Sequence, residues 1–219
     1  MAYGAAESFR KALISGIFIC CGFAASAEPV VIAALGDSLT QGYGLPEQDG
    51  FVPQLEQWLH DRGVDVRLIN AGVSGDTTAG GAARVEWTLT PDVDGMIVAL
   101  GGNDLLRGID PSVSRANLDR ILGAANTAEV DVLLIGLPAP GNYGPDYKQA
   151  FDAIYPDLAQ QHQILYAPNF FEGFDVGDNT GNADRLMQPD GIHPNKHGVA
   201  VIIDTLGPYV LELVEQASD

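Results

Sequence analysis

The chain has 219 residues, of which 46% are hydrophobic and 18% are charged, a composition typical of a globular protein and not of a disordered or fibrous one. Acidic residues outnumber Lys and Arg by 29 to 11, and the formal net charge at pH 7 is −18. Such an acidic surface opposes binding to nucleic acid and to anionic membranes, so we expect neither as a partner.

The N-terminal segment is typical of a secretory signal peptide. The basic pair Arg10-Lys11 precedes an apolar stretch over 12–24, and Ala25-Ser26-Ala27 then fits the small-x-small pattern of a cleavage site. The apolar stretch is short for a retained transmembrane anchor. We therefore expect residues 1–27 to be removed, leaving a single domain over 28–219 that is periplasmic or secreted and has no stable membrane insertion.

Both cysteines of the chain, Cys20 and Cys21, lie within this predicted signal peptide. Ile19 before Cys20 is too bulky for the small residue that a lipoprotein signal places there, so we do not expect a lipid anchor. Without these two residues the mature domain has neither a disulfide nor a thiol, and its core alone must hold it together.

Five short apolar runs along the chain are typical of buried strands. They lie at Val30–Leu35, Val64–Ile69, Met96–Leu100, Val132–Leu137 and Gln163–Ala167. Helical patterns are found at 51–59, 80–89, 116–125, 147–161 and 196–215, and we expect Trp58 and Trp87 to lie in the core. Apolar strands that alternate with helices predict a parallel sheet covered on both faces. The expected fold is therefore an α/β protein, a three-layer α/β/α sandwich with about five parallel strands.

The segment Leu35–Gln41, with the sequence LGDSLTQ, follows the first predicted strand directly. Ser38 would lie where the strand ends and a helix begins, beside backbone N–H groups that have no helical partner. That position suits a nucleophile that must generate and hold an oxyanion. An Asp-Ser pair before a helix is also an ordinary N-cap, so the segment alone leaves both interpretations open.

Three further polar clusters follow other predicted strands or precede the last helix. Gly75 can bring its backbone N–H close to a ligand, and Asn103 can point its amide out from a strand end. Asp190 lies three residues before His193 across a glycine, which would let its carboxylate fix the tautomer of the imidazole. Each cluster alone is also an ordinary turn or cap. Together they would meet at the carboxyl ends of the strands, where open α/β sheets bind ligands.

These four blocks, Gly-Asp-Ser-Leu, Ser-Gly-Asp-Thr, Gly-Gly-Asn-Asp and Asp-Gly-Ile-His-Pro, resemble the SGNH (GDSL-type) hydrolases, and the similarity spans roughly residues 30–210. Within that family the chain is most similar to the bacterial thioesterase I, arylesterase and lysophospholipase branch. The resemblance implies a flavodoxin-like sandwich and a triad of Ser38, His193 and Asp190. It also implies an oxyanion hole formed by the backbone N–H groups of Ser38 and Gly75 and by the amide of Asn103, with no cofactor and no metal.

The sequence thus predicts an exported serine esterase that hydrolyses aryl or alkyl esters through an acyl-enzyme, with thioesters and lysophospholipids as further candidates. Its partner would be a small-molecule or lipid ester. The resemblance places the acyl pocket beside the loop after Asn103, and the candidate substrate-binding residues are Leu105, Leu106, Ile109 and Tyr143. Arg107 would either neutralise a substrate anion or pair with a nearby acid.

Three alternatives remain open. A carbohydrate acetylesterase uses the same four blocks and would prefer acetyl groups to longer chains. A metal-dependent hydrolase could use Asp37, Asp76, Asp104 and His193, although no His-x-x-x-His or similar ligand spacing is present. A non-catalytic binding protein on the same scaffold would usually lack one of the catalytic residues. The chain has no G-x-S-x-G motif, which argues against the α/β-hydrolase fold.

Overall fold

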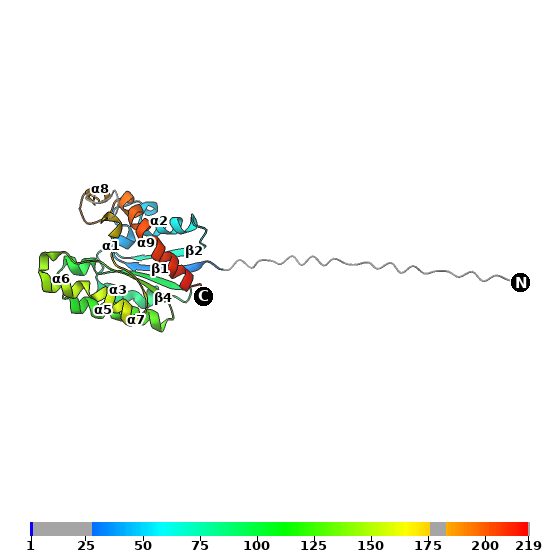
Figure 1. Cartoon of the computed structure of the whole chain (residues 1–219), viewed down its shortest axis with the longest axis horizontal. Coiled ribbons are helices and arrows are strands. Elements are labelled where there is room, and N and C mark those ends of the chain that lie inside the picture. Colours follow the sequence, from blue (N-terminus) through cyan, green and yellow to red (C-terminus); the bar gives the residue numbers. More distant parts are fainter. Residues whose placement is uncertain (2–27, 176–182, 219) are drawn as a thin grey trace.

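The computed structural model describes Met1 and residues 28–175 and 183–218. Residues 2–27 of the predicted signal peptide, with both cysteines, lie outside these described residues. Figure 1 shows the chain from end to end, with the C-terminus close to the start of the first strand.

The centre of the fold is one sheet of five parallel strands, as the apolar runs predict. The strands are β1 (Val30–Gly36), β2 (Val66–Gly72), β3 (Gly95–Ala99), β4 (Asp131–Ile135) and β5 (Leu165–Ala167), in the spatial order β2-β1-β3-β4-β5. The register places Gly36 beside Gly72 on one side and beside Ala99 on the other. The ends of β1, β2 and β3 therefore lie next to one another, with β1 in the middle.

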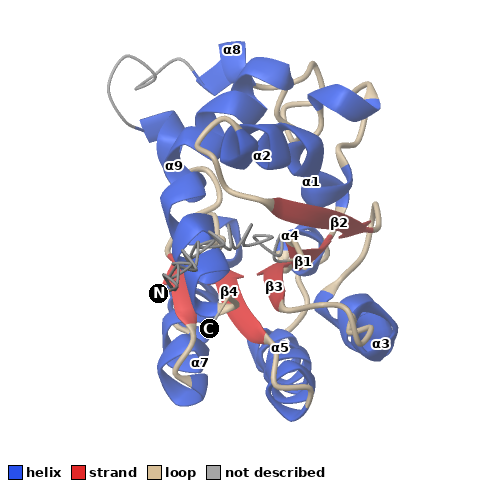
Figure 2. Ribbon diagram, turned by 90° about the vertical axis from the view of Figure 1, so that its right-hand side faces the viewer, coloured by secondary structure: helices blue, strands red, loops and turns tan. Residues whose placement is uncertain are grey.

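Helices cover both faces of this sheet (Figures 1 and 2). One layer consists of α1 (Ser38–Gln41), α2 (Phe51–His60), α8 (Ala183–Leu186) and α9 (Lys196–Gln216), together with the 3-10 turn η3 (Glu172–Asp175). The opposite layer contains α3 (Thr78–Thr88), α5 (Pro111–Thr127), α6 (Pro145–Asp152) and α7 (Ile154–His162). The short helix α4 (Gly102–Leu106) follows β3, and two further 3-10 turns are η1 (Glu47–Asp49) and η2 (Gly141–Tyr143).

A hydrophobic cluster fills the space between the sheet and each of the two helix layers. There are two such clusters because successive residues of a strand face opposite sides of the sheet. Ile97 of β3 packs toward the α2 and α9 layer, whereas its neighbours Met96 and Val98 pack toward α3, α5 and α7. Helix α9 is long and apolar enough to cross a membrane by length and composition. Many of its apolar residues, among them Ile202 and Val210, are buried in the first of these clusters. The three-layer sandwich predicted from the sequence is confirmed.

One predicted helix is divided in the structure. The pattern over 147–161 forms two helices, α6 and α7, which are separated at Ala153. Pro156 explains the break, because it has no N–H to donate to the carbonyl of Asp152 and its ring clashes with that carbonyl in a continuous helix. In the first turn of α7 the missing donor costs nothing.

The placement of the two tryptophans differs from the expectation. Trp58 packs against the core and is only partly buried, whereas Trp87 is 85% exposed, so its expected core position is wrong. The buried residues of α3 are Thr78, Gly81, Ala82 and Val85. Trp87 does not lie on this buried face of α3, and its side chain faces solvent on the other side of the helix.

Candidate active site

Three loops meet at the carboxyl ends of the central strands. The loop after β2 is joined to the end of β1 by a hydrogen bond of 3.1 Å from the Val73 N–H to the Gly36 carbonyl. Gly72 allows the close contact, because a side chain there would collide with the backbone of Gln41 in α1. The loop after β3 begins with α4, which carries Asn103. Ser38, at the start of α1, therefore lies between the Gly75 and Asn103 loops.

Ser38, His193 and Asp190 form a continuous chain of hydrogen bonds. The Ser38 Oγ lies 2.8 Å from His193 Nε2, and His193 Nδ1 lies 2.7 Å from Asp190 Oδ2. Because an ionised carboxylate only accepts, Nδ1 carries a proton and Nε2 is left free to accept the hydroxyl proton. The aromatic ring of Tyr43 packs against the imidazole, with 4.6 Å between ring centroids.

The loop that carries Asp190 and His193 is held by its own backbone. Asp190 Oδ1 accepts hydrogen bonds from the N–H groups of Ile192 (2.9 Å) and His193 (3.0 Å). Three hydrogen bonds lower the pKa of Asp190 from 3.8 to about 2. The bond from the His193 N–H has the largest effect, followed by that from the His193 imidazole and that from the Ile192 N–H. Asp190 is therefore ionised throughout the neutral and mildly acidic range. Downstream, Asn195 caps α9 by accepting from the N–H groups of His197 and Gly198.

Gly75 occupies a tight turn in the loop after β2. The Asp76 N–H donates to the Val73 carbonyl over 3.0 Å, and Gly75 has a φ of 81°. A positive φ at the third position of a hydrogen-bonded turn is typical of a type II turn and requires glycine or asparagine. Within the described ranges, the backbone N–H groups of Gly75 and Ser38 donate to no other group of the protein. Both are thus available to a ligand.

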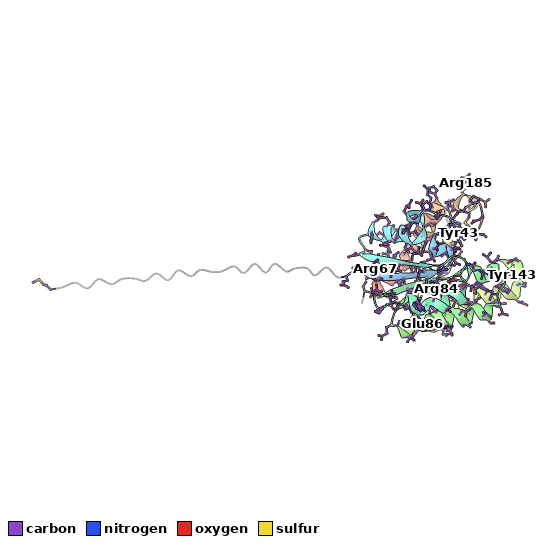
Figure 3. All side chains as sticks on the ribbon, turned by 180° about the vertical axis from the view of Figure 1, so that it is seen from behind. Tyr43, Arg67, Arg84, Glu86, Tyr143 and Arg185 are labelled. Carbon is purple, nitrogen blue, oxygen red and sulfur yellow. The ribbon has the colours of Figure 1, made fainter. Side chains whose placement is uncertain are left out.

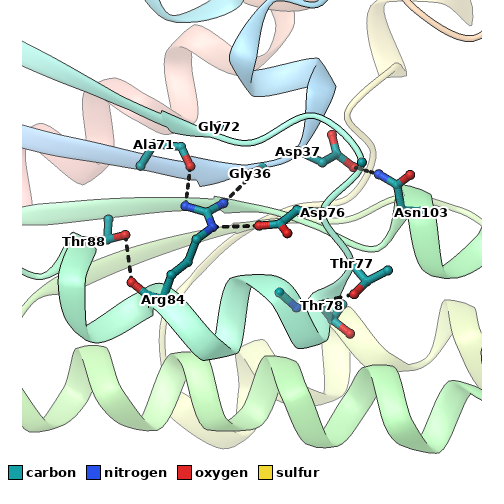
Figure 4. A network of polar contacts seen from close by, with 12 residues as sticks. Gly36, Asp37, Ala71, Gly72, Asp76, Thr77, Thr78, Arg84, Thr88 and Asn103 are labelled. Carbon is teal, nitrogen blue, oxygen red and sulfur yellow. Dashed lines mark hydrogen bonds and ion pairs between the residues drawn. The ribbon is translucent and has the colours of Figure 1, made fainter.

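The amide of Asn103 is held by Asp37, the residue before Ser38. Asn103 Nδ2 donates to Asp37 Oδ2 over 3.3 Å (Figure 4). The other oxygen of Asp37 accepts from the Leu39 N–H and so caps α1, which confirms the ordinary interpretation of this Asp as an N-cap. Burial raises the pKa of Asp37 from 3.8 to about 6, against the opposing effect of its hydrogen bonds.

A buried polar cluster fastens α4 to the helices below it. Asp104 is fully buried and accepts three hydrogen bonds, from the Thr78 N–H (2.8 Å), the Thr78 hydroxyl (2.6 Å) and the Ser114 hydroxyl (2.9 Å). Asn117 in turn donates to the Thr78 hydroxyl over 3.0 Å. Asp104 therefore ties the helix that carries Asn103 to both α3 and α5.

The four candidate substrate-binding residues divide into two groups. Leu105 is buried in the core cluster on the α5 side, so its side chain packs inward. Leu106 and Tyr143 are exposed, by 61% and 42%, and the Tyr143 hydroxyl lies 3.5 Å from the Leu106 carbonyl. Ile109 is half-buried, and its carbonyl accepts a hydrogen bond from Tyr147. Figure 3 shows Tyr43 and Tyr143 toward the same end of the molecule, away from Arg67.

Among the residues that the structure describes, Arg107 forms no ion pair with an acidic side chain, which was one of the two roles that the sequence suggests for it. Its guanidinium donates to the Gly75 carbonyl over 2.8 Å and so links α4 to the turn after β2. Sequence reasoning also missed the roles of Arg84 and Tyr43, since both depend on contacts between distant segments. Among the described residues, no group of three or more His, Cys, Asp or Glu side chains is placed to hold a metal ion.

Comparison with known proteins agrees with this architecture. Residues 34–201 match the model of the GDSL-like Lipase/Acylhydrolase family. The chain is 35% identical to Esterase TesA of Pseudomonas aeruginosa, over 94% of this chain and 100% of that protein. It is also 35% identical to Thioesterase 1/protease 1/lysophospholipase L1 of Escherichia coli K12, over 89% of each chain. The crystal structure of AlinE4, an SGNH-hydrolase family esterase, superposes with a TM-score of 0.69 at 40% identity, covering 85% of this chain and 97% of that one.

The chain therefore belongs to the GDSL-like lipase and acylhydrolase family. The family match covers most of the chain, and the relatives are aligned over nearly their whole length. More particularly, the protein is a carboxylic ester hydrolase of the TesA, arylesterase and thioesterase type.

Proposed function

We propose that the protein is an exported serine esterase in which Ser38 is the nucleophile, His193 the general base and Asp190 the residue that orients the imidazole. The observation that carries this proposal is the unbroken chain from the Ser38 Oγ through His193 to Asp190, with contacts of 2.8 and 2.7 Å. Both distances are within the range over which a base removes a hydroxyl proton.

The reaction proceeds in two halves. The Ser38 Oγ attacks the ester carbonyl carbon as its proton passes to His193 Nε2, and a tetrahedral oxyanion forms. The bond to the leaving oxygen then breaks, and His193 returns the proton to the departing alcohol. A water molecule next attacks the acyl-enzyme, again losing its proton to His193. As this second oxyanion collapses, the bond between the acyl carbon and the Ser38 Oγ breaks, His193 returns its proton to the Oγ, and the carboxylic acid is released.

The oxyanion is stabilised by three donors from three strand ends, the N–H groups of Ser38 and Gly75 and the side-chain amide of Asn103. Two observations support this assignment. Among the described residues, the N–H groups of Ser38 and Gly75 donate to no other group of the protein, and Asp37 orients the amide of Asn103. Preorganised donors of this kind are worth about 100- to 1,000-fold in turnover each. No metal and no cofactor take part in this scheme.

The proposed substrates are aryl and alkyl esters, with thioesters and lysophospholipids as further candidates. The printed names of the relatives include an esterase, an arylesterase and a thioesterase that is also a lysophospholipase. The exposed apolar side chains of Leu106, at the end of α4, and of Tyr143, at the end of the 3-10 turn η2, favour an apolar acyl group. Export rests on the sequence of residues 1–27, and its test is N-terminal sequencing of the secreted or periplasmic protein, which should begin at Glu28.

Initial rates on p-nitrophenyl esters of increasing acyl length, measured with residues 28–219, test the catalytic proposal. Ser38→Ala should lose at least about 1,000-fold in kcat while it remains folded. If Ser38→Ala retained most of the activity, the proposed nucleophile would be wrong. A preference for acetate over all longer chains would favour a carbohydrate acetylesterase instead.

A further inference from the structure

Arg84 donates hydrogen bonds to three acceptors next to the segments that form the proposed oxyanion hole (Figure 4). Its Nε donates to the carboxylate of Asp76 over 2.7 Å. One terminal nitrogen donates to the Ala71 carbonyl (2.7 Å) and the other to the Gly36 carbonyl (2.8 Å). The Arg84 and Asp76 side chains retain only 23% and 18% of their exposure, so solvent screens this ion pair weakly.

The three acceptors belong to the two segments that supply the backbone donors. Gly36 is the last residue of β1 and lies two residues before Ser38. Ala71 is the second-to-last residue of β2, and Asp76 directly follows Gly75. A single planar guanidinium thus fixes the end of β1, two residues before Ser38, relative to the loop that carries Gly75. Arg is suited to this task, since its donors have a rigid fork geometry.

The peptide unit between Gly75 and Asp76 is held from both sides. Arg107 donates to the Gly75 carbonyl over 2.8 Å, whereas Arg84 holds the side chain of Asp76. The fold also makes room for Asp76, because any side chain at position 80 would collide with its carboxylate, and residue 80 is glycine. The position of Asp76 is therefore specified by several residues and not by the ion pair alone.

We infer that Arg84 is a positioning residue for catalysis: through Gly36 and Asp76 it sets the spacing between the Ser38 and Gly75 backbone N–H groups, which must converge on the same oxyanion. This inference rests on the function proposed above. Arg84 has no role in holding the substrate in its ground state. Its loss therefore weakens binding of the tetrahedral transition state and leaves binding of the ester unchanged.

The test compares Arg84→Lys and Arg84→Ala with the wild type, and expresses kcat per active site counted by titration with a phosphonate ester. Counting sites removes any contribution from an unfolded fraction. A lysine retains the positive charge near Asp76 but cannot bond three acceptors at once, so kcat should fall about 10-fold, and about 100-fold for alanine, as small misplacements of catalytic groups do. KM should stay within about two-fold.

A second measurement separates positioning from general loosening of the fold. A trifluoromethyl ketone that forms a tetrahedral adduct with Ser38 should lose affinity in parallel with kcat/KM over Arg84→Lys, Arg84→Ala and Asp76→Asn. The control is Arg67→Ala, since Arg67 lies on β2, the edge strand that also carries Ala71, and forms an exposed ion pair with Asp92. It should change neither kcat nor the affinity for the ketone.

The outcomes are distinguishable. Unchanged kcat per titrated site in both Arg84 variants overturns this inference, as does a rise in KM at constant kcat. If the Arg84 inference fails in this way but Ser38→Ala is inactive in the same series, the proposed serine mechanism still stands. Full activity of Ser38→Ala overturns the mechanism itself, whatever the Arg84 variants do.

Discussion

The side-chain amide of Asn103 donates a hydrogen bond to the carboxylate of Asp37, the residue that precedes Ser38. An ionised carboxylate can only accept hydrogen bonds, so it selects the rotamer in which the nitrogen of Asn103, and not its oxygen, faces Asp37. In the proposed mechanism, the second N–H of the same nitrogen donates to the oxyanion. We therefore infer that Asp37 determines which end of the Asn103 amide faces the substrate.

Asp37→Asn should therefore lower kcat although it removes no donor from the oxyanion hole. An asparagine at position 37 can donate as well as accept, so the amide of Asn103 can flip and present its oxygen to the substrate. We expect a loss of about 10- to 100-fold in kcat, smaller than the loss of about 100- to 1,000-fold for Asn103→Ala. Steady-state kinetics on p-nitrophenyl esters measure both.

The matched control is Asp61→Asn, since the Asp61 carboxylate also accepts from a side-chain amide, that of Gln57, but on the exposed end of α2. It should leave kcat unchanged. Wild-type kcat in Asp37→Asn would show that Asn103 keeps its orientation without the carboxylate.

The stability of the protein should fall as pH rises through the titration of Asp37. Burial raises its pKa to about 6, against 3.8 in an unfolded chain, so the folded state binds the proton more tightly. Ionisation of Asp37 does not affect the free energy of unfolding below about pH 4. Between about pH 4 and 6 it lowers this free energy progressively, and above about pH 6 the loss reaches an upper limit of roughly 3 kcal/mol. The free energy of unfolding of Asp37→Asn should therefore increase relative to wild type over this window. Urea denaturation from pH 4 to 8 provides the measurement, and a pH-independent difference would contradict it.

Removal of the Asp104 carboxylate should destabilise the fold severely. Asp104→Ala leaves the N–H of Thr78 and the hydroxyls of Thr78 and Ser114 without their acceptor in the interior. The cost should be at least about 3 kcal/mol in the free energy of unfolding. Asp157→Ala, which breaks an exposed pair with Arg115, should cost less than about 1 kcal/mol in the same urea titration. Equal losses in the two variants would contradict the structural role of Asp104.

The exposed pair of Leu106 and Tyr143 should influence chain-length preference more than rate on short substrates. Truncation to alanine removes apolar surface that a long acyl chain would cover, at roughly 25 cal/mol per Å². We expect KM for a p-nitrophenyl octanoate to rise about three- to ten-fold in Tyr143→Ala, whereas KM for the acetate stays near wild type. Val113→Ala, an exposed apolar residue on α5, serves as the control. An equal change on both esters would show that Tyr143 does not contact the acyl chain.

The sequence allowed the sheet and most helices to be predicted because strands buried on both faces leave a plain apolar signal. β1 and β3 agree with the predicted runs within a residue at each end. β2 is displaced and runs from Val66 to Gly72, because its last residues pair with β1 although they are polar or small. Such pairing depends on the neighbouring strand and leaves little trace in local composition.

For the site, the sequence indicated the residues but not the contacts that support them. Ser38, His193 and Asp190 could be proposed from short motifs, since Asp190 and His193 are close in the chain and Ser38 follows a strand. The bonds from Asn103 to Asp37 and from Arg84 to Gly36 join segments 66 and 48 residues apart. They follow only from the strand order β2-β1-β3, which the apolar pattern does not specify.

The contact between the Ser38 Oγ and His193 Nε2 spans 155 residues of the chain. Ser38 lies near the start of the described domain, and His193 lies just before its last helix. A polypeptide that is still emerging from the ribosome or from a translocation channel therefore lacks one half of the pair until almost its whole length is free. Under the proposed mechanism, ester hydrolysis therefore requires both ends of the domain to be folded together, and an incomplete chain that lacks His193 should not react with esters.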